Sequence, residues 1–174
     1  MTSWLKLEKS EYAEVWDKFY QQFKFKPSVD EKDWPGIREP SASVTYDISN
    51  FWKDFTEEKY YDLHQKALQV FQNCTKTDEV MYALDWQHEC YKFNPHLPLD
   101  TVPYKPHESA SMLNQWLIQI IPDGDYSIFL TKDFKNGLFG HPWQQTICVF
   151  GNCFLQSFEK FKPIVFNEIK RRKP

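Results

Sequence analysis

The chain has 174 residues, the length of one domain over residues 1–174, and its 41% hydrophobic and 26% charged residues are values typical of globular proteins. Its net charge of −3 argues against a general nucleic-acid binder, because such proteins carry a basic footprint. The polar N-terminus lacks the apolar segment of a signal peptide, and no apolar run approaches the roughly 18 residues that span a membrane. We therefore expect a cytoplasmic protein that contacts neither nucleic acid nor a membrane.

Two segments in the first half of the chain repeat their apolar residues with the period of a helix. One runs from Ser10 to Phe23, and the other follows Thr56, a favourable N-cap, to about Asn73. After the first segment, residues 27–42 are rich in proline and are predicted to be irregular. They are followed by a short β-strand at 43–47 and a short helical piece at 49–55.

The period of the apolar residues changes from 3.6 to 2 at residues 80–93. This alternation predicts one long strand of an antiparallel sheet. Alternation along such a strand places His88 and Cys90 on one face and Asp85 on the other.

A β-hairpin is predicted around Gly124. Residues 116–121 and 126–132 are rich in β-forming side chains, and the sequence Pro-Asp-Gly-Asp between them is a strong turn signal. Turn chemistry also accounts for Asp123 and Asp125.

The remaining segments are assigned from their glycines, prolines and apolar periods. Residues 94–108 and 134–143 are predicted as loops, and 145–150 as a strand. A final helix is expected from Asn152 to Ile169, and the basic run at 170–173 that follows it is interpreted as a solvated tail.

This order of elements favours an α+β fold. We expect an antiparallel β-sheet of about four to five strands, with the N-terminal, middle and C-terminal helices packed mainly on one face. The four cysteines, Cys74, Cys90, Cys148 and Cys153, form no CxxC pair and are expected to be buried, reduced thiols.

Sequence motifs for catalysis or cofactor binding are absent. The chain has no GxGxxG, Walker, GxSxG or HExxH pattern, and its five histidines lack metal-ligand spacing with the cysteines. We expect no cofactor and no metal and lean against an enzyme, although a site assembled from distant residues would escape these tests.

Four residues are candidates for contact with a ligand or partner: Asp85, His88, His141 and Trp143. The first two belong to the run Asp-Trp-Gln-His-Glu-Cys, whose residue types serve acid–base or nucleophilic chemistry. A half-buried strand is the favoured explanation of this run, because alternation keeps its members from converging on one site. The other two lie in Gly-His-Pro-Trp at 140–143, a loop shaped by glycine and proline. A histidine there could act as an acid or base, orient a ligand, or simply bond the loop backbone.

The segment 121–134, followed by Phe-Gly-His-Pro-Trp at 139–143, resembles an uncharacterised bacterial family, domain of unknown function 2716. The early Trp-x-x-Phe-Tyr at 16–20 and residues 85–93 fit the same pattern, so the resemblance covers most of the chain. It implies no activity. Small acidic bacterial α+β proteins often serve as immunity partners of toxins, which is an analogy at the level of the fold.

Two hypotheses of function follow. The first is a non-catalytic protein-binding module, with a toxin-neutralising immunity protein as one form, motivated by the mild acidity and by 15 Phe, 9 Tyr and 7 Trp. The alternative is a small-molecule-binding protein or enzyme with a pocket at the Gly140–Trp143 loop. Convergence of the candidate side chains on one cleft would favour the alternative.

Overall fold

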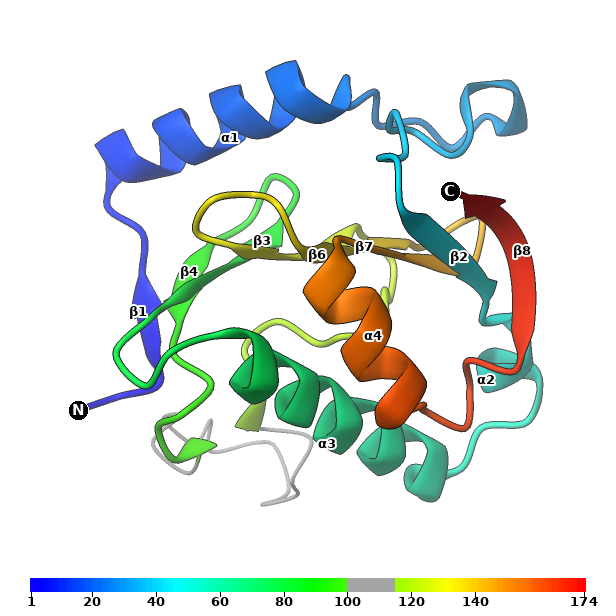
Figure 1. Ribbon diagram of the computed structural model, residues 1–174. Helices are drawn as coiled ribbons and strands as arrows, with labels where there is room; N and C mark the ends of the chain where they lie inside the picture. The colour runs from blue at the N-terminus through cyan, green and yellow to red at the C-terminus, as the bar shows by residue number, and fades with distance from the viewer. Residues whose placement is uncertain (100–114) are drawn as a thin grey trace, which may run out of the picture.

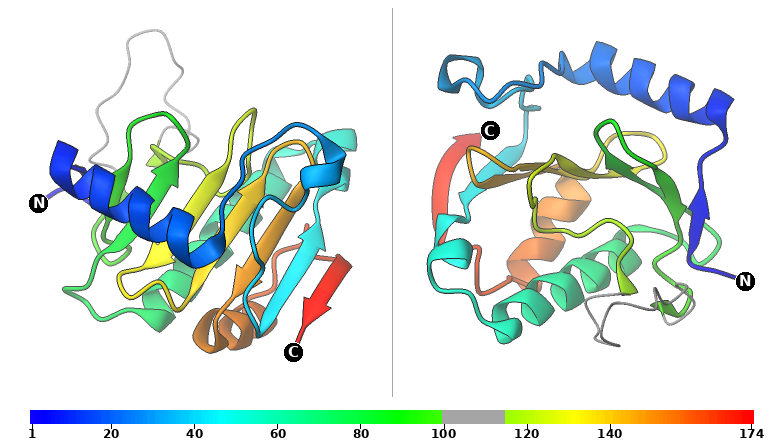
Figure 2. Two further views of the ribbon diagram at one scale, coloured as in Figure 1. Left: turned by 90° about the horizontal axis from the view of Figure 1, so that it is seen from above. Right: turned by 180° about the vertical axis from the view of Figure 1, so that it is seen from behind.

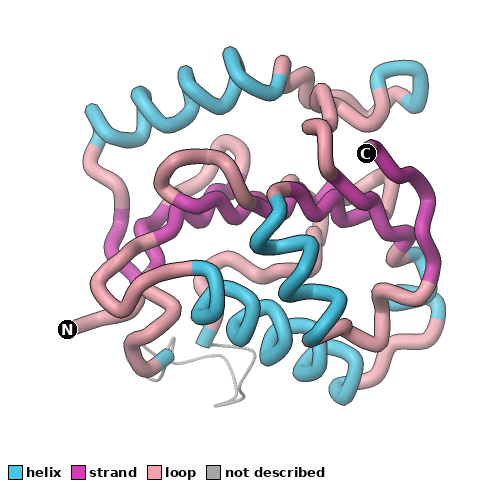
Figure 3. The backbone as a smooth tube through the Cα atoms, viewed as in Figure 1, coloured by secondary structure: helices cyan, strands magenta, loops and turns pink. Residues whose placement is uncertain are grey.

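The computed structural model describes residues 1–99 and 115–174. An eight-stranded antiparallel sheet runs through its centre, with the strand order β1-β4-β3-β5-β6-β7-β2-β8 (Figures 1 and 3). Its strands are β1 (Trp4–Lys6), β2 (Ser43–Asp47), β3 (Met81–Asp85), β4 (Tyr91–Phe93), β5 (Ser127–Thr131), β6 (Gly137–His141), β7 (Thr146–Phe150) and β8 (Glu168–Lys173). The helices are α1 (Lys9–Phe23), the 3-10 turn η1 (Glu31–Asp33), α2 (Ser49–Lys53), α3 (Glu57–Cys74) and α4 (Asn152–Lys160).

Helices cover both faces of the sheet. In Figures 1 and 2, α1 crosses one face, whereas α3 and α4 pack on the other. Each face has its own apolar cluster, one centred on Phe19 and Phe139 and the other on Phe71 and Phe129. The prediction of helices mainly on one face is therefore right for α3 and α4 and wrong for α1. The central strands β5, β6 and β7 are buried along their whole length, so both of their faces need a cover.

Periodicity correctly located several elements. The structure confirms the first helix, the strand at 43–47, the short helix after it, the helix that Thr56 caps, and the strand β7. The Thr56 hydroxyl accepts a hydrogen bond from the Lys59 N–H at 3.2 Å, as its N-cap position predicts. The α+β class and the antiparallel sheet are confirmed, but the sheet has eight strands rather than four to five.

The single strand predicted at 80–93 is wrong. The chain folds back on itself there, so that β3 and β4 pair with Met81 opposite Phe93. The turn between them contains no glycine or proline, and Gln87 itself adopts the left-handed conformation, with φ of 64°. The apolar residues alternate without a break across this turn, and no glycine or proline in the sequence indicates it.

The hairpin predicted around Gly124 is also wrong, although its second strand, at 126–132, is confirmed as β5. Residues 116–121 form no strand, and they run as an irregular segment that buries Trp116, Ile118 and Ile120. The Ile120 N–H donates to Nε2 of the buried His64 at 3.0 Å instead of to a strand partner. The apolar residues that suggested a strand are thus explained by burial of the segment against the α3 side of the sheet.

The hairpin partner of β5 is β6, so the loop predicted at 134–143 is wrong for residues 137–141, which form this strand. The two glycines in β6 suggested a loop, but close packing accounts for Gly137. A Cβ atom there would lie 2.6 Å from the Phe129 carbonyl oxygen and 2.6 Å from the Phe150 ring. Of the loop predicted at 94–108, residues 100–108 lie outside the described residues.

The C-terminal region contains a short helix and a strand where one long helix and a tail were predicted. The final helix ends at Lys160, before Pro163, and the basic run lies in β8, which pairs with β2 (Figure 2). The prediction of a solvated tail is right for the exposure of Lys170, Arg172 and Lys173, but wrong for the conformation, because the run is a strand. The remaining residue of the run, Arg171, forms a salt bridge with the buried carboxylate of Glu39. β8 forms one edge of the sheet.

A disulfide joins Cys74, at the end of α3, to Cys153, in the first turn of α4. The prediction of reduced thiols is therefore wrong for this pair, which no sequence spacing marked. It is confirmed for Cys90 and Cys148, which are free and buried. None of the helices in the described part of the chain combines the length and apolar character needed to cross a membrane.

Candidate functional site

The four candidate residues lie at one end of the sheet. Asp85, the last residue of β3, pairs with Ser127, which in turn pairs with Gly140 of β6. His141 ends β6, and the turn holding His88 follows β3 directly. Strands far apart in sequence thus bring both candidate segments to the same end of the fold (Figure 2).

Asp85, His88 and Asp125 form a cluster, here called the Asp–His–Asp cluster. The His88 Nδ1 atom lies 3.2 Å from Oδ1 of Asp85 and 3.2 Å from Oδ2 of Asp125. The β3–β4 turn makes this contact possible, because the His88 N–H bonds back to the Asp85 carbonyl at 3.2 Å. The expected separation of Asp85 from His88 on opposite strand faces is therefore wrong.

Burial and mutual contact shift the pKa values within this cluster. Desolvation raises the pKa of Asp85, against the opposing effect of its hydrogen bond with His88. Desolvation likewise raises the pKa of Asp125. The hydrogen bond with Asp85 raises the pKa of His88. Among the residues that the structure describes, neither carboxylate forms a salt bridge with lysine or arginine, so His88 is their ionic partner.

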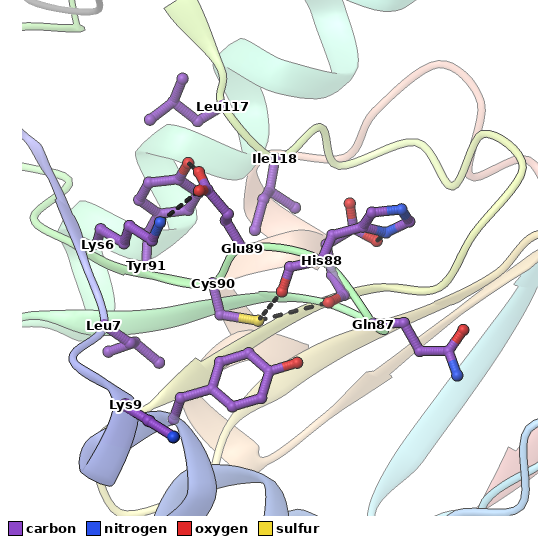
Figure 4. A pocket seen from close by; sticks show the side chains of 12 residues that line it. Lys6, Leu7, Lys9, Gln87, His88, Glu89, Cys90, Tyr91, Leu117 and Ile118 are labelled. Atoms are coloured by element: carbon purple, nitrogen blue, oxygen red, sulfur yellow. Dashed lines mark hydrogen bonds and ion pairs between the residues drawn. The ribbon is translucent and has the colours of Figure 1, made fainter.

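Two cavities meet beside this cluster. One, of about 720 Å³, lies between the start of the chain and the β3–β4 turn, and Figure 4 shows the Lys6–Glu89 ion pair and His88 among its lining side chains. The second, of about 250 Å³, is lined by both aspartates of the cluster and by Asp123. Asp85, Leu117 and Ile118 line both cavities. Asp85 is therefore accessible from both cavities.

The thiol of Cys90 also lines the larger cavity but is poorly suited to nucleophilic chemistry. Its S–H donates to the Asp85 carbonyl oxygen at 3.4 Å, and Figure 4 shows its sulfur facing the turn backbone. Burial raises the pKa of this thiol to about 11. A thiol with that pKa stays protonated at neutral pH, and the thiolate is the reactive form.

His141 is fully buried and lines neither of these two cavities. Its Nδ1 accepts a hydrogen bond from the Gln144 N–H at 3.0 Å, and its Nε2 has no partner among the described residues. The rings of Trp34, Tyr126 and Trp143 surround it at centroid distances of 5.3, 5.0 and 6.0 Å. Burial lowers the pKa of His141 to about 4, so the ring is neutral at pH 7 and supports the turn after β6.

Replacing His141 with asparagine should make the protein less sensitive to acid. The folded-state pKa of about 4 lies below the usual value of 6.5, so the unfolded chain binds more protons between these values. The contribution of His141 to stability is complete above pH 6.5 and is lost as the pH falls toward 4. When the pH is lowered from 7 to 5, the free energy of unfolding of His141→Asn should fall by about 2 kcal/mol less than that of wild type. Urea unfolding at the two pH values measures this difference. Equal losses would contradict the buried, neutral state of His141.

Aromatic side chains surround this end of the sheet on the α1 side. The ring of buried Tyr126 contacts Trp86 at 6.0 Å and Trp143 at 5.4 Å between centroids. The Trp86 Nε1–H donates to the Tyr20 hydroxyl at 3.1 Å. Trp143 is 36% exposed and Tyr20 is 39% exposed. We call Tyr20, Trp34, Trp86 and Trp143 the aromatic surface.

The likeness to known proteins extends over most of the chain. A family model described as "Protein of unknown function (DUF2716)" matches residues 6–155. The chain belongs to this family. The uncharacterised protein YxiI of Bacillus subtilis (strain 168) is 31% identical to it over 173 residues, which are 95% of this chain and 98% of that protein. No solved structure matches. The resemblance predicted from the sequence is therefore confirmed.

The part of the chain that matches the DUF2716 model includes the Asp–His–Asp cluster, His141 and Trp143. Sequence reasoning missed Asp125, which it assigned to turn chemistry alone. Asp125 does serve the local backbone, since its Oδ1 accepts a hydrogen bond from the Tyr126 N–H at 2.8 Å. Its second oxygen faces His88, and only the pairing of β3 with β5 brings the two residues together.

Proposed function

We propose that this member of DUF2716 is a non-catalytic protein-binding module that contacts its partner through the aromatic surface. The observation that carries the proposal is the exposure of Trp143 and Tyr20 around the buried ring of Tyr126. Exposed tryptophan and tyrosine side chains are the residue types that dominate binding energy in protein interfaces. Trp143 packs on Tyr126 and Tyr20 packs on Phe25, and this support limits the side-chain entropy lost on binding.

The partner is a protein that presents arginine or lysine side chains. The faces of tryptophan and tyrosine rings attract such cations, and the net charge of −3 steers a basic partner toward the chain. A toxin with a basic surface has this chemistry, and its neutralisation is the form of binding that we favour.

The alternative of a small-molecule pocket at Gly140–Trp143 has less support. The His141 ring is enclosed by aromatic side chains, and the one hydrogen bond that it forms with described residues goes to the turn backbone. The two cavities described above lie beside Asp85 and His88 instead.

The test compares two tryptophans of nearly equal exposure, Trp143 at 36% and Trp52, on α2, at 37%. A protein that copurifies with the chain from its native cells is identified, and its affinity for each variant is measured by calorimetry. We expect Trp143→Ala to weaken binding by about 2 kcal/mol, roughly 30-fold, and Trp52→Ala to leave it unchanged.

Thermal unfolding of both variants confirms that each is folded at the temperature of the binding measurement. Equal affinities of Trp143→Ala and Trp52→Ala would contradict the proposed surface. So would the lack of any copurifying protein whose binding depends on Trp143.

A further inference from the structure

We propose that Asp85, His88 and Asp125 bind a divalent first-row transition-metal ion. This inference is independent of the proposed function, because it involves none of the four side chains of the aromatic surface. The sequence predicted no metal, since its histidines and cysteines lack ligand spacing. The three residues come instead from the end of β3, the β3–β4 turn and the segment before β5.

The spacing of the three side chains suits an ion. Their ligand atoms, one imidazole nitrogen and two carboxylate oxygens, all lie within 4.8 Å of one another. In a tetrahedral site with ligand bonds of about 2.0–2.2 Å, neighbouring ligand atoms are separated by about 3.3–3.6 Å. The Nδ1 atom of His88 already lies 3.2 Å from each carboxylate oxygen. An ion would therefore need only a small adjustment of the side chains.

The chemistry of these ligands narrows the class of ion. One imidazole with two carboxylates suits borderline ions such as Zn²⁺, Co²⁺ or Mn²⁺, whereas Ca²⁺ and Mg²⁺ prefer oxygen ligands alone. The two carboxylates face a single imidazole, and no lysine or arginine in the described ranges pairs with either. The cluster therefore has negative charge available for a cation when His88 is neutral.

The cavity beside the cluster gives a bound ion room for further ligands. Asp85 and Asp125 both line the space of about 250 Å³, together with Asp123 and Ser127. Three protein ligands leave at least one coordination position of a tetrahedral ion open. Water or a small anionic ligand in this cavity would occupy that position.

The competing explanation is a purely structural one, in which protonated His88 bridges the two carboxylates without any ion. Both explanations use the same distances, and only one of them predicts saturable binding of a metal. We therefore test binding directly by titrating Zn²⁺ into chelator-treated protein near pH 7.5 in a calorimeter. We expect one ion per chain and much weaker binding of Mg²⁺.

Single substitutions assign the ligands. Asp85→Asn, His88→Ala and Asp125→Asn should each weaken Zn²⁺ binding by at least about tenfold. The matched control is Asp78→Asn, since Asp78 is an exposed carboxylate in the turn before β3, at the opposite end of that strand. It should bind Zn²⁺ like wild type.

A second measurement does not depend on substitutions. Zn²⁺ should shift the imidazole ¹⁵N resonances of His88, with the larger change at Nδ1, and leave those of buried His64 in place. No binding in the calorimeter would overturn the proposal. Binding that all three cluster variants retain, or that Asp78→Asn weakens equally, would also overturn it.

Discussion

Replacing Arg171 with methionine is expected to lower the free energy of unfolding by about 3–5 kcal/mol, because it leaves a buried carboxylate without its counter-ion. Glu39 is only 4% exposed, and the Arg171 Nε atom lies 2.9 and 3.2 Å from its two oxygens. Thr45 adds one hydrogen bond to this carboxylate at 3.1 Å, which cannot replace the lost charge. Urea unfolding at pH 7 measures the change.

The neighbouring Arg172 provides the control for this experiment. Arg172 is exposed in the same strand, so Arg172→Met should change stability by no more than about 0.5 kcal/mol. Adding Glu39→Gln to Arg171→Met should recover part of the loss, because the second substitution removes the unpaired charge. If Arg171→Met and Arg172→Met unfold at the same urea concentration, the ion pair does not hold β8 in place.

Opening the disulfide should cost about 4.5 kcal/mol in the chain-entropy model, because Cys74 and Cys153 close a loop with a sequence separation of 79. We expect the variant Cys153→Ser, and wild type treated with reductant, to lose comparable stability in urea unfolding. The structure predicts two titratable thiols in the oxidised, denatured protein, those of Cys90 and Cys148.

The reductant separates this effect from the loss of a buried side chain. It should destabilise wild type and have no effect on Cys153→Ser, whose remaining cysteines form no disulfide. Four titratable thiols in the untreated protein, or a wild type indifferent to reductant, would show that the bond does not form.

Helices were easier to predict from this sequence than strands. The apolar residues of α1 repeat at helical spacing because one side of the helix contacts the sheet, and Val15, Trp16, Phe19 and Phe23 are buried as the pattern requires. Apolar content without helical spacing was ambiguous. In residues 116–121 it reflects burial of an irregular segment, and in 80–93 it continued through a turn.

Long-range pairing explains the other errors. The apolar residues predicted a final helix as far as Ile169. Instead, the β2 edge pairs with Glu168–Lys173, and buried Glu39 provides Arg171 with a counter-ion. No local pattern in residues 168–173 contains that information.

The candidate site was predicted only in part. Asp85 and His88 were both selected from their residue types, but strand alternation placed them apart, and Asp125 was explained by its turn. Their contact depends on the β3–β4 turn and on the pairing of β3 with β5. His141 and Trp143 do lie side by side, although His141 supports the turn backbone from within the core.

The position of β2 between β7 and β8 determines when this half of the molecule can form during synthesis. Residues 43–47 leave the ribosome early, whereas both of their partners lie at 146–150 and 168–173. At a translation rate of about 5–20 residues per second, β2 waits on the order of ten seconds with both edges unpaired. Pairing across such sequence distances is slow, so β2 stays an unpaired segment of the nascent chain until the strands at the other end of the sequence have been made.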